Sequence, residues 1–138
     1  HGDYRSGNFL FDEATGRINA WLDWERGHLG DRHRDLAWTT HPGFGHYSED
    51  GKTYYNCGLI PKDEFYDRYS AASGLSVDPA RLEYYRILNC FQIIASVTAT
   101  ATRVAGLGKS HQDVLLTRVK GMESITGLEL MRLLKDKI

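Results

Sequence analysis

Helical periodicity runs through residues 59–138, so more than half of the chain carries a pattern that strands do not accommodate. Pro61 stands where the first turn of a helix tolerates a missing N–H, and apolar residues then recur at helical spacing until Gly74. Asp78–Pro79 combines a capping carboxylate with a proline and starts a second helix. Ser110 starts a third helix, which carries leucines at helical spacing. These signals predict a helical body.

Two short β-prone runs precede this body, Phe9–Phe11 and Ile18–Leu22. The link between them is rich in turn residues, and its Gly16 can supply a positive φ. We therefore expect a β-hairpin. Because the two ends of an antiparallel hairpin lie side by side, Asn8 at its start and Asp23 at its end should be neighbours.

Between the hairpin and the helical body, the sequence predicts a short buried helix and a long loop. Residues 35–38 place three apolar side chains after an aspartate, as at the start of a buried helix. Residues 41–58 hold a proline, several glycines and few aliphatic side chains, which is typical of long functional or mobile loops. We expect an α+β, mainly helical fold that forms a single domain over residues 1–138, with the hairpin packed on the helical body.

Composition argues against several kinds of partner. The 138 residues include 17 basic and 18 acidic residues, a net charge of −1, so no global field attracts nucleic acid or an anionic membrane. No uninterrupted apolar run approaches the roughly 18 residues that would span a bilayer. Cys57 and Cys90 do not form a disulfide-dense pattern, so we expect reduced thiols and a cytoplasmic protein.

The hairpin also carries side chains with a definite chemistry. Asp3 lies on a short loop, and a carboxylate within reach of an attacking hydroxyl is the base that phosphoryl transfer to an alcohol requires. Asn8 and Asp23 offer the hard oxygen ligands that suit Mg²⁺. Glu25 points to the side of Asp23 if the strand pleat continues, as a second carboxylate ligand or an acceptor behind the metal. One such carboxylate alone would be a surface turn residue, but the ordered set indicates Mg²⁺-dependent phosphoryl transfer.

This set resembles the aminoglycoside phosphotransferase and choline kinase group, small-molecule kinases with a protein-kinase-like fold. The resemblance covers about the first 38 residues and rests on His1-Gly2-Asp3 with Asn8, Leu22-Asp23-Trp24-Glu25, Gly30-Asp31 and Asp35-Leu36-Ala37. Within the group, D-Y-R-x-G-N and L-D-W-E are most similar to phosphotransferase-type domains related to those fused to acyl-CoA dehydrogenases. The helical remainder is compatible with the C-terminal lobe of that fold.

The resemblance implies a role for each matching residue of the reacting centre. Asp3 would be the catalytic base that orients or deprotonates the acceptor hydroxyl. Asn8 and Asp23 would coordinate the Mg²⁺ that bridges the phosphates of the co-substrate ATP. Arg5 would reach the γ-phosphate as a charge-neutralising clamp, or else be a solvated loop residue.

Two more residues would support the loop. His1 would brace it from behind without touching the substrate. Asp35, at the mouth of a helix, would accept backbone hydrogen bonds from the loop and keep it rigid.

The chain departs from that group in one respect. The group places a nucleotide-binding lobe before the His-Gly-Asp motif, and these residues do not include one. The end of a P-loop is suggested by residues 106–110, but Arg103 replaces the first glycine that a P-loop needs. We expect the C-terminal lobe of a longer kinase, with residues 1–38 as the catalytic hairpin and 59–138 as the substrate-side body. Alone it should not bind ATP tightly or turn over, and uncovered apolar surface should favour self-association.

The acceptor and two other functions stay open. The acceptor is a hydroxyl of a small molecule, such as an aminoglycoside, a choline-like alcohol, a sugar, an amino-acid alcohol or a hydroxylated acyl chain. A metal-dependent phosphohydrolase would instead use His1, Asp3, Asp23 and Glu25 as ligands. A non-catalytic, kinase-like module would bind without transferring phosphate.

Overall fold

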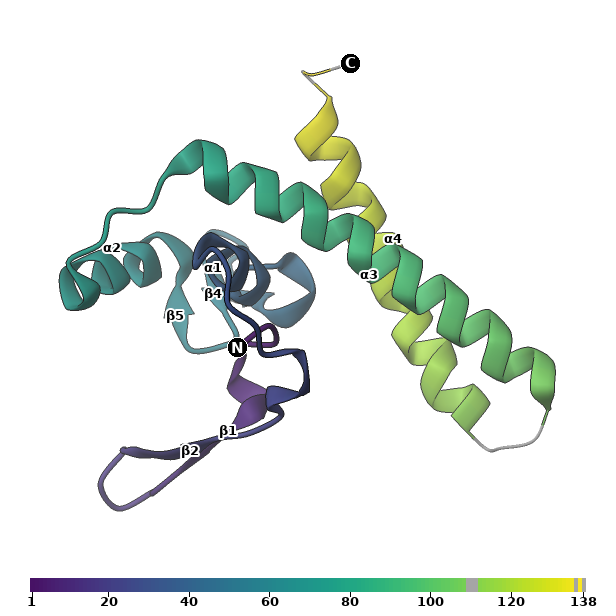
Figure 1. Ribbon diagram of the computed structural model, residues 1–138, viewed down its shortest axis with the longest axis horizontal. Helices are drawn as coiled ribbons and strands as arrows, with labels where there is room; N and C mark the ends of the chain where they lie inside the picture. Colours follow the sequence, from purple (N-terminus) through teal and green to yellow (C-terminus); the bar gives the residue numbers. More distant parts are fainter. Residues whose placement is uncertain (109–111, 136, 138) are drawn as a thin grey trace. The chain divides into compact units, whose positions relative to one another are not determined.

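The structure is a computed structural model that describes residues 1–108, 112–135 and 137 (Figure 1). The fold is α+β and mainly helical, as the sequence predicts. The chain divides into two compact units, His1–Arg86 and Ile87–Ile138. The expectation of a single domain over residues 1–138 stays a prediction. All residues with an expected chemical role lie in the first unit.

The predicted hairpin is confirmed. β1 (Phe9–Phe11) pairs in antiparallel register with β2 (Ile18–Trp21), with an irregularity in the middle of β1 (Figure 1). The Asp12 carboxylate holds the turn by accepting a hydrogen bond from the backbone N–H of Ala14 at 2.8 Å. Gly16 closes the turn at a φ of 66°, which glycine adopts without strain.

The short helix α1 (His33–Thr39) supplies much of the core of the first unit. Leu36, Ala37 and Trp38 on this helix are all buried, as predicted for a buried helix. With 7 residues, α1 is too short to be stable by itself. Its stability therefore comes from packing and from polar contacts at its ends.

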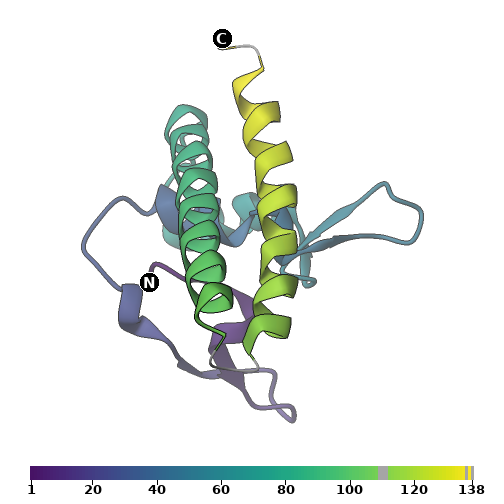
Figure 2. The ribbon, with the colours of Figure 1, turned by 90° about the vertical axis from the view of Figure 1, so that its right-hand side faces the viewer.

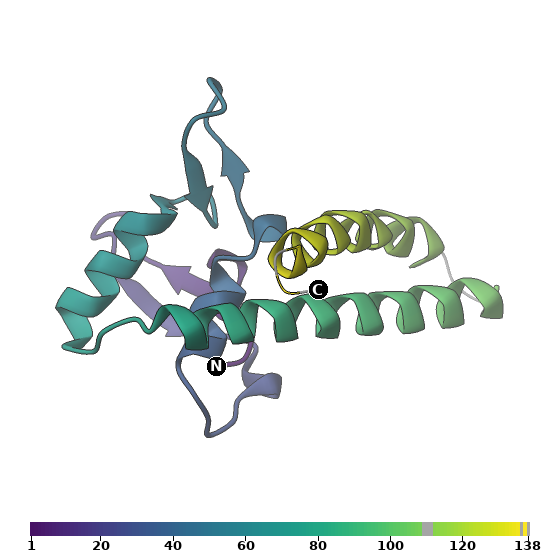
Figure 3. The same cartoon turned by 90° about the horizontal axis from the view of Figure 1, so that it is seen from above.

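Residues 41–58 are not the irregular loop that the sequence predicts. β3 (His46–Tyr47), β4 (Tyr54–Asn56) and β5 (Ile60–Pro61) form a three-stranded antiparallel sheet with β4 in the centre (Figure 3). The prediction is wrong because strands of two or three residues are too short for an alternating pattern to be visible.

Helix α2 (Lys62–Ser73) begins and ends where the sequence predicts, and it packs on β4 and β5. Pro61 precedes its first residue. Asp63 and Glu64 lie in its first turn, where negative charge complements the helix dipole. Gly74 ends the helix at a φ of 69°, the left-handed conformation of a glycine C-cap.

Two long helices make up the rest of the chain. α3 (Pro79–Leu107) starts at the predicted cap, where Asp78 Oδ1 accepts a hydrogen bond from the backbone N–H of Ala80 at 2.9 Å. In the second unit, the C-terminal part of α3 runs alongside α4 (Gln112–Leu134) (Figure 2). The predicted start of the last helix at Ser110 lies outside the described residues.

One helix in the described part of the chain is long and apolar enough to cross a membrane. It is the stretch Pro79–Val104 of α3, whose mean hydropathy reaches 1.2. A core helix of a soluble protein passes the same test of length and composition, so one such helix is weak evidence. The expectation that the protein has no membrane partner stays a prediction.

A buried histidine ties the start of α1 to the start of α3. The Nδ1 atom of His33 lies 2.7 Å from Asp31 Oδ1, and its Nε2 accepts a hydrogen bond from the backbone N–H of Asp78 at 2.9 Å. Because Nε2 accepts a hydrogen bond, the proton of the neutral ring is on Nδ1, which donates a hydrogen bond to Asp31 Oδ1. Arg81 Nε completes the group at 3.0 Å from Asp31 Oδ2. We call these four residues the His33 clasp.

Replacing Asp31 with Asn should remove the part of the acid sensitivity of the clasp that comes from the Asp31 carboxyl. Partial burial raises the pKa of Asp31, but hydrogen bonds from His33 and the charge of Arg81 outweigh it, so the net pKa lies below the usual 3.8. A carboxyl with a lowered folded-state pKa stabilises the fold above its unfolded pKa and loses that contribution as the pH falls. At about pH 7, wild type should have the larger free energy of unfolding, and the difference should shrink at about pH 3. Chemical denaturation at both pH values measures it, and an unchanged difference would contradict the assignment.

Candidate active site

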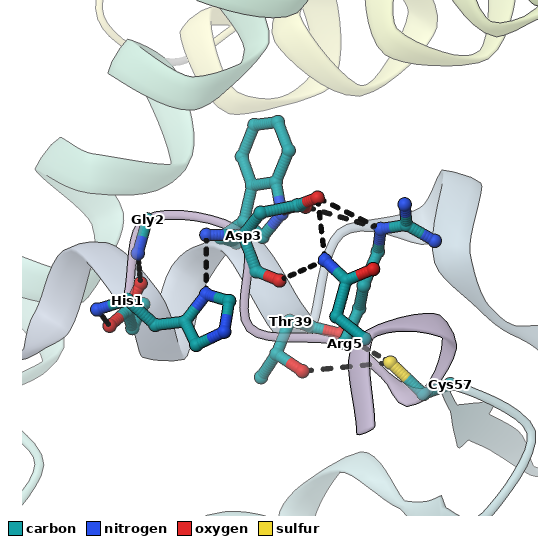
Figure 4. Close-up of polar contacts among 9 residues, drawn as sticks. His1, Gly2, Asp3, Arg5, Thr39 and Cys57 are labelled. Atoms are coloured by element: carbon teal, nitrogen blue, oxygen red, sulfur yellow. Dashed lines mark hydrogen bonds and ion pairs between the residues drawn. The ribbon is translucent and has the colours of Figure 1, made fainter. Parts of the chain in front are cut away.

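Asp35 on α1 contacts the start of the loop of residues 1–8. The Asp35 carboxylate accepts hydrogen bonds from the backbone nitrogens of His1 and Gly2, each at 2.8 Å (Figure 4). Gly2 has a φ of 83°, and a Cβ at this position would collide with the backbone of Arg26. The loop therefore packs closely at a point where only glycine fits. The role of Asp35 as a support of the loop stays a prediction.

The buried carboxylate of Asp3 is the polar centre of the loop. The indole N–H of Trp38 donates to Asp3 Oδ1 at 2.6 Å, and Asn8 Nδ2 donates to Oδ2 at 2.8 Å. Arg5 Nε lies 3.2 Å from both oxygens (Figure 4). Charge-assisted bonds of this kind are directional. Three donors, two from the loop and one from α1, thus hold the carboxylate in one orientation.

Asn8 and Asp23 lie at the two ends of the hairpin. The backbone N–H of Leu22 donates to Asn8 O at 2.8 Å, which places Asp23 one residue beyond the paired ends. The Asn8 amide nitrogen also donates to the carbonyl oxygen of Asp3 at 2.9 Å. Because this nitrogen is committed to Asp3, the amide oxygen is the atom with which Asn8 can bind a cation.

Asp23 has a left-handed backbone, with φ 67° and ψ 50°. This conformation is uncommon for a residue other than glycine, although aspartate tolerates it better than most. Strain of this kind costs on the order of 1–3 kcal/mol and is concentrated at functional sites. The left-handed backbone of Asp23 turns the chain from β2 into the 3₁₀ helix η2 (Trp24–Arg26). The Asp23 side chain is exposed.

The expected position of Glu25 does not hold. β2 ends at Trp21 and η2 replaces the strand, so no pleat sets Glu25 on the side of Asp23. Among the described residues, no three side chains of the His, Cys, Asp or Glu type are grouped so as to hold a metal ion. A pair made of Asn8 and Asp23 is a different kind of site, because Mg²⁺ takes few protein ligands and completes its shell with phosphates and water.

The ring of His1 packs in an aromatic group behind the loop. Its centroid lies 4.4 Å from that of Trp24 and 5.9 Å from that of Trp21, which stacks on Tyr4 at 4.4 Å. His1 Nδ1 accepts a hydrogen bond from the backbone N–H of Asp3 at 3.3 Å. The ring therefore contacts the backbone of the loop and not the Asp3 carboxylate. Its bracing role stays a prediction.

A cavity of about 340 Å³ opens beside Arg5. Residues 43–46 supply one wall, and the guanidinium carbon of Arg5 lies 6.0 Å from the Phe44 ring. Cys57, whose φ is 50°, also lines the cavity, and its carbonyl oxygen accepts a hydrogen bond from the Ser6 hydroxyl at 3.3 Å. The segment expected to be a functional loop thus contributes to a cavity that is lined by Arg5, the ion-pair partner of Asp3.

Two residues of this site have almost no signal in the sequence. Trp38 reads as an ordinary core residue of α1, and only the need of a buried indole N–H for an acceptor points to a polar role. The guanidinium of Arg26 lies over the Trp38 ring in a cation–π contact, 4.4 Å from the ring centroid. Cys57 reaches the site through the β4–β5 turn, and the sequence gives no sign of its left-handed backbone.

The sequence that carries these residues resembles known proteins. The model of the phosphotransferase enzyme family matches residues 1–85, which is more than half of the chain. The acyl-CoA dehydrogenase family member 11 of Pongo abelii is 27% identical over 143 aligned residues, and this finding agrees with the finer resemblance read from the sequence. The match covers 96% of this chain but 18% of that protein, so the chain spans less than a fifth of the relative. No solved structure matches the chain.

Proposed function

Because the chain belongs to the phosphotransferase enzyme family, we propose that it transfers the γ-phosphoryl group of ATP, bound with Mg²⁺, to a hydroxyl of a small molecule. One observation carries the proposal. Asp3 and Asn8 are in hydrogen-bond contact at 2.8 Å, and the hairpin returns to bring Asp23 beside the same end. A base, an amide oxygen and a carboxylate in that order are the parts that this transfer requires.

Asp3 is proposed as the base. The acceptor oxygen bonds to the γ-phosphorus, the bond from that phosphorus to the bridging oxygen breaks, and ADP leaves. The hydroxyl proton passes to the Asp3 carboxylate, a contribution typically worth about 10²–10⁴-fold in rate. Because Trp38 and Asn8 already fix the carboxylate, it is oriented before the acceptor arrives.

Asn8 and Asp23 are proposed to hold Mg²⁺. The amide nitrogen of Asn8 is bonded to Asp3, so the amide oxygen of Asn8 can bind the ion from one side of the hairpin. The exposed carboxylate of Asp23 can bind it from the other side. Bound there, Mg²⁺ would neutralise charge on the β- and γ-phosphates. Glu25, which lies in η2 and not on the continued strand pleat, is proposed as a further ligand, directly or through water.

The remaining residues of the loop are proposed to position or to neutralise. His1 and Asp35 hold the loop backbone through the contacts to Asp3 N and Gly2 N. Arg5 supplies the positive charge next to the reacting groups. Its expected contact with the γ-phosphate stays a prediction.

ATP itself is proposed to bind to a nucleotide-binding lobe that these 138 residues do not contain, since no phosphate-binding glycine pattern occurs in them. The 138 residues alone should then be inactive, and apolar surface should favour their self-association. We also propose a cytoplasmic protein, because Cys57 and Cys90 do not form a disulfide-dense pattern in the sequence. We propose no nucleic-acid or membrane partner.

Replacing Trp38 with Phe should lower kcat by about tenfold while the KM for ATP stays unchanged. Phenylalanine keeps the ring packing but removes the N–H that fixes Asp3 Oδ1, and a hydrogen bond to a charged group is worth about 1.5–3 kcal/mol. Steady-state kinetics of the full-length gene product measure the effect, and a thermal melt checks the fold. An unchanged kcat in a folded variant would show that Asp3 does not depend on Trp38.

The direct test is ADP formation by the full-length gene product with ATP and a pool of hydroxylated metabolites. We expect ADP formation that requires both Mg²⁺ and an acceptor, and none from the 138 residues alone. Hydrolysis of p-nitrophenyl phosphate with Mn²⁺ or Zn²⁺, without nucleotide, would favour the phosphohydrolase instead. The described residues give that alternative no three-ligand group around His1, Asp3, Asp23 and Glu25.

A further inference from the structure

Three N–H donors engage the Asp3 carboxylate. An ionised carboxylate offers about four acceptor positions. Trp38 takes one on Oδ1 and Asn8 takes one on Oδ2, at 2.6 Å and 2.8 Å, and Arg5 Nε spans both oxygens at 3.2 Å. A hydroxyl that is to give its proton to Asp3 therefore competes with these three donors for the two carboxylate oxygens.

Arg5 is the donor that can leave. Its contacts with Asp3 are the longest of the set, and its side chain is 38% exposed, whereas Asn8 and Trp38 are 5% and 7% exposed. An ion pair that is partly exposed contributes little stability, so exchanging its partner is easy. Within the part of the chain that the structure describes, the two terminal nitrogens of the Arg5 guanidinium donate no hydrogen bond to a protein oxygen.

The cavity beside Arg5 has a wall that suits an anion. Among the described residues that line it there is one arginine and no carboxylate; the others are polar, aromatic, thiol or glycine residues. The Asp50 carboxylate, in the turn between β3 and β4, is not on this wall; it accepts a hydrogen bond from the Ser48 hydroxyl at 2.6 Å and lies 3.9 Å from the Lys52 ammonium. A volume of about 340 Å³ is at the lower end of the range for small-ligand sites.

From this arrangement we infer that the acceptor carries an oxyanion, a carboxylate or a phosphate, beside its hydroxyl group. The planar guanidinium of Arg5 can pair with either oxyanion in a bidentate manner. In doing so, Arg5 gives up its ion pair with Asp3 and binds the small-molecule substrate. The substrate hydroxyl then donates its hydrogen bond to the carboxylate oxygens of Asp3 that Arg5 has left. The inference, which rests on the proposed function of Asp3 as base, makes Arg5 a specificity residue and disfavours polycationic amines as acceptors.

Binding without turnover tests this inference separately from the proposed function. The full-length gene product is saturated with Mg²⁺ and a non-hydrolysable ATP analogue, so that a γ-phosphate already fills its own site. Glycolate, glycerol 3-phosphate, ethylene glycol and ethanolamine are then titrated by calorimetry. At least one of the two anions should bind about tenfold or more tightly than the neutral and cationic hydroxyl compounds. The better anion identifies the carboxylate or the phosphate as the recognised group.

Three variants locate the binding. Arg5→Gln should weaken anion binding by about tenfold, because it removes a charged donor. Arg17→Gln, on the exposed turn of the hairpin, is the matched control and should change nothing. Asp3→Asn removes the internal competitor for Arg5 and should strengthen anion binding by about twofold to fivefold, which a merely structural role would not do.

Several results would overturn the inference. Tighter binding of ethanolamine, unchanged binding in Arg5→Gln, or weaker binding in Asp3→Asn would each do so. If a parallel titration without the ATP analogue shows anion binding and the saturated sample shows none, Arg5 is assigned to the γ-phosphate instead. Should Arg5→Gln fail to fold, the Asp3→Asn arm decides. Failure of the proposed function would be seen as the absence of ADP formation, which these titrations do not involve.

Discussion

We expect the Asp3→Asn variant of the full-length gene product to lose phosphoryl transfer by about 10²–10⁴-fold, because it loses its general base. Asparagine has the shape of aspartate, and its side-chain oxygen can still accept the Trp38 N–H that binds Oδ1. Asp3 is not among the proposed Mg²⁺ ligands, so the affinity for ATP should change little. Steady-state kinetics and a calorimetric titration with Mg²⁺ and ATP measure the two quantities.

The matched control is Asp67→Asn, which makes the same chemical change at an exposed position of α2. It should keep the activity of the wild type. If Asp3→Asn kept most of its activity, the base would have to lie elsewhere. If it lost ATP binding together with activity, Asp3 would be a metal ligand.

The second large effect is expected for Asp23→Ala, which should weaken binding of the Mg²⁺–ATP complex and lower transfer by about 10²-fold or more. A bound metal ion typically supplies several kcal/mol of charge stabilisation, and the variant removes its carboxylate ligand. Alanine must also adopt the left-handed backbone of residue 23, at φ 67°, which costs stability. Titration of ATP binding against Mg²⁺ concentration measures the first effect, and thermal unfolding measures the second.

Asp23→Gly separates these two effects. Glycine adopts a positive φ without strain and likewise has no carboxylate. The glycine and alanine variants should therefore lose Mg²⁺-dependent binding equally, while the glycine variant unfolds at the higher temperature. Wild-type dependence on Mg²⁺ in both variants would remove Asp23 from the metal site.

The parts of the fold that are predictable from the sequence are those set by local chemistry. The hairpin follows from two β-prone runs around a link that contains Asp12 and Gly16, and both residues act within that turn. Gly74 and Asp78 end and start helices through contacts with residues nearby in the chain. The sheet within residues 41–61 is different, because its two- and three-residue strands are defined only by their partners.

The candidate site shows the same division. The order of Asp3, Asn8 and Asp23 is written in the sequence, and the hairpin explains why the last two come together. The bond from Trp38 to Asp3 joins residues 35 positions apart, and no local signal records it. Arg5 and Asp3 are only two residues apart in the sequence. The motif predicts a catalytic role for each of them, but it does not predict that the two side chains form an ion pair with each other.

Phosphorus NMR of one reaction mixture tests the central claim most directly. The mixture contains the full-length gene product, ATP, Mg²⁺ and a pool of hydroxylated metabolites, and a parallel sample contains the Asp3→Asn variant. The account predicts that the γ-phosphate signal of ATP is replaced by that of a phosphate monoester, with ADP, in the wild-type sample only. Release of inorganic phosphate alone, or equal monoester formation by Asp3→Asn, would contradict it.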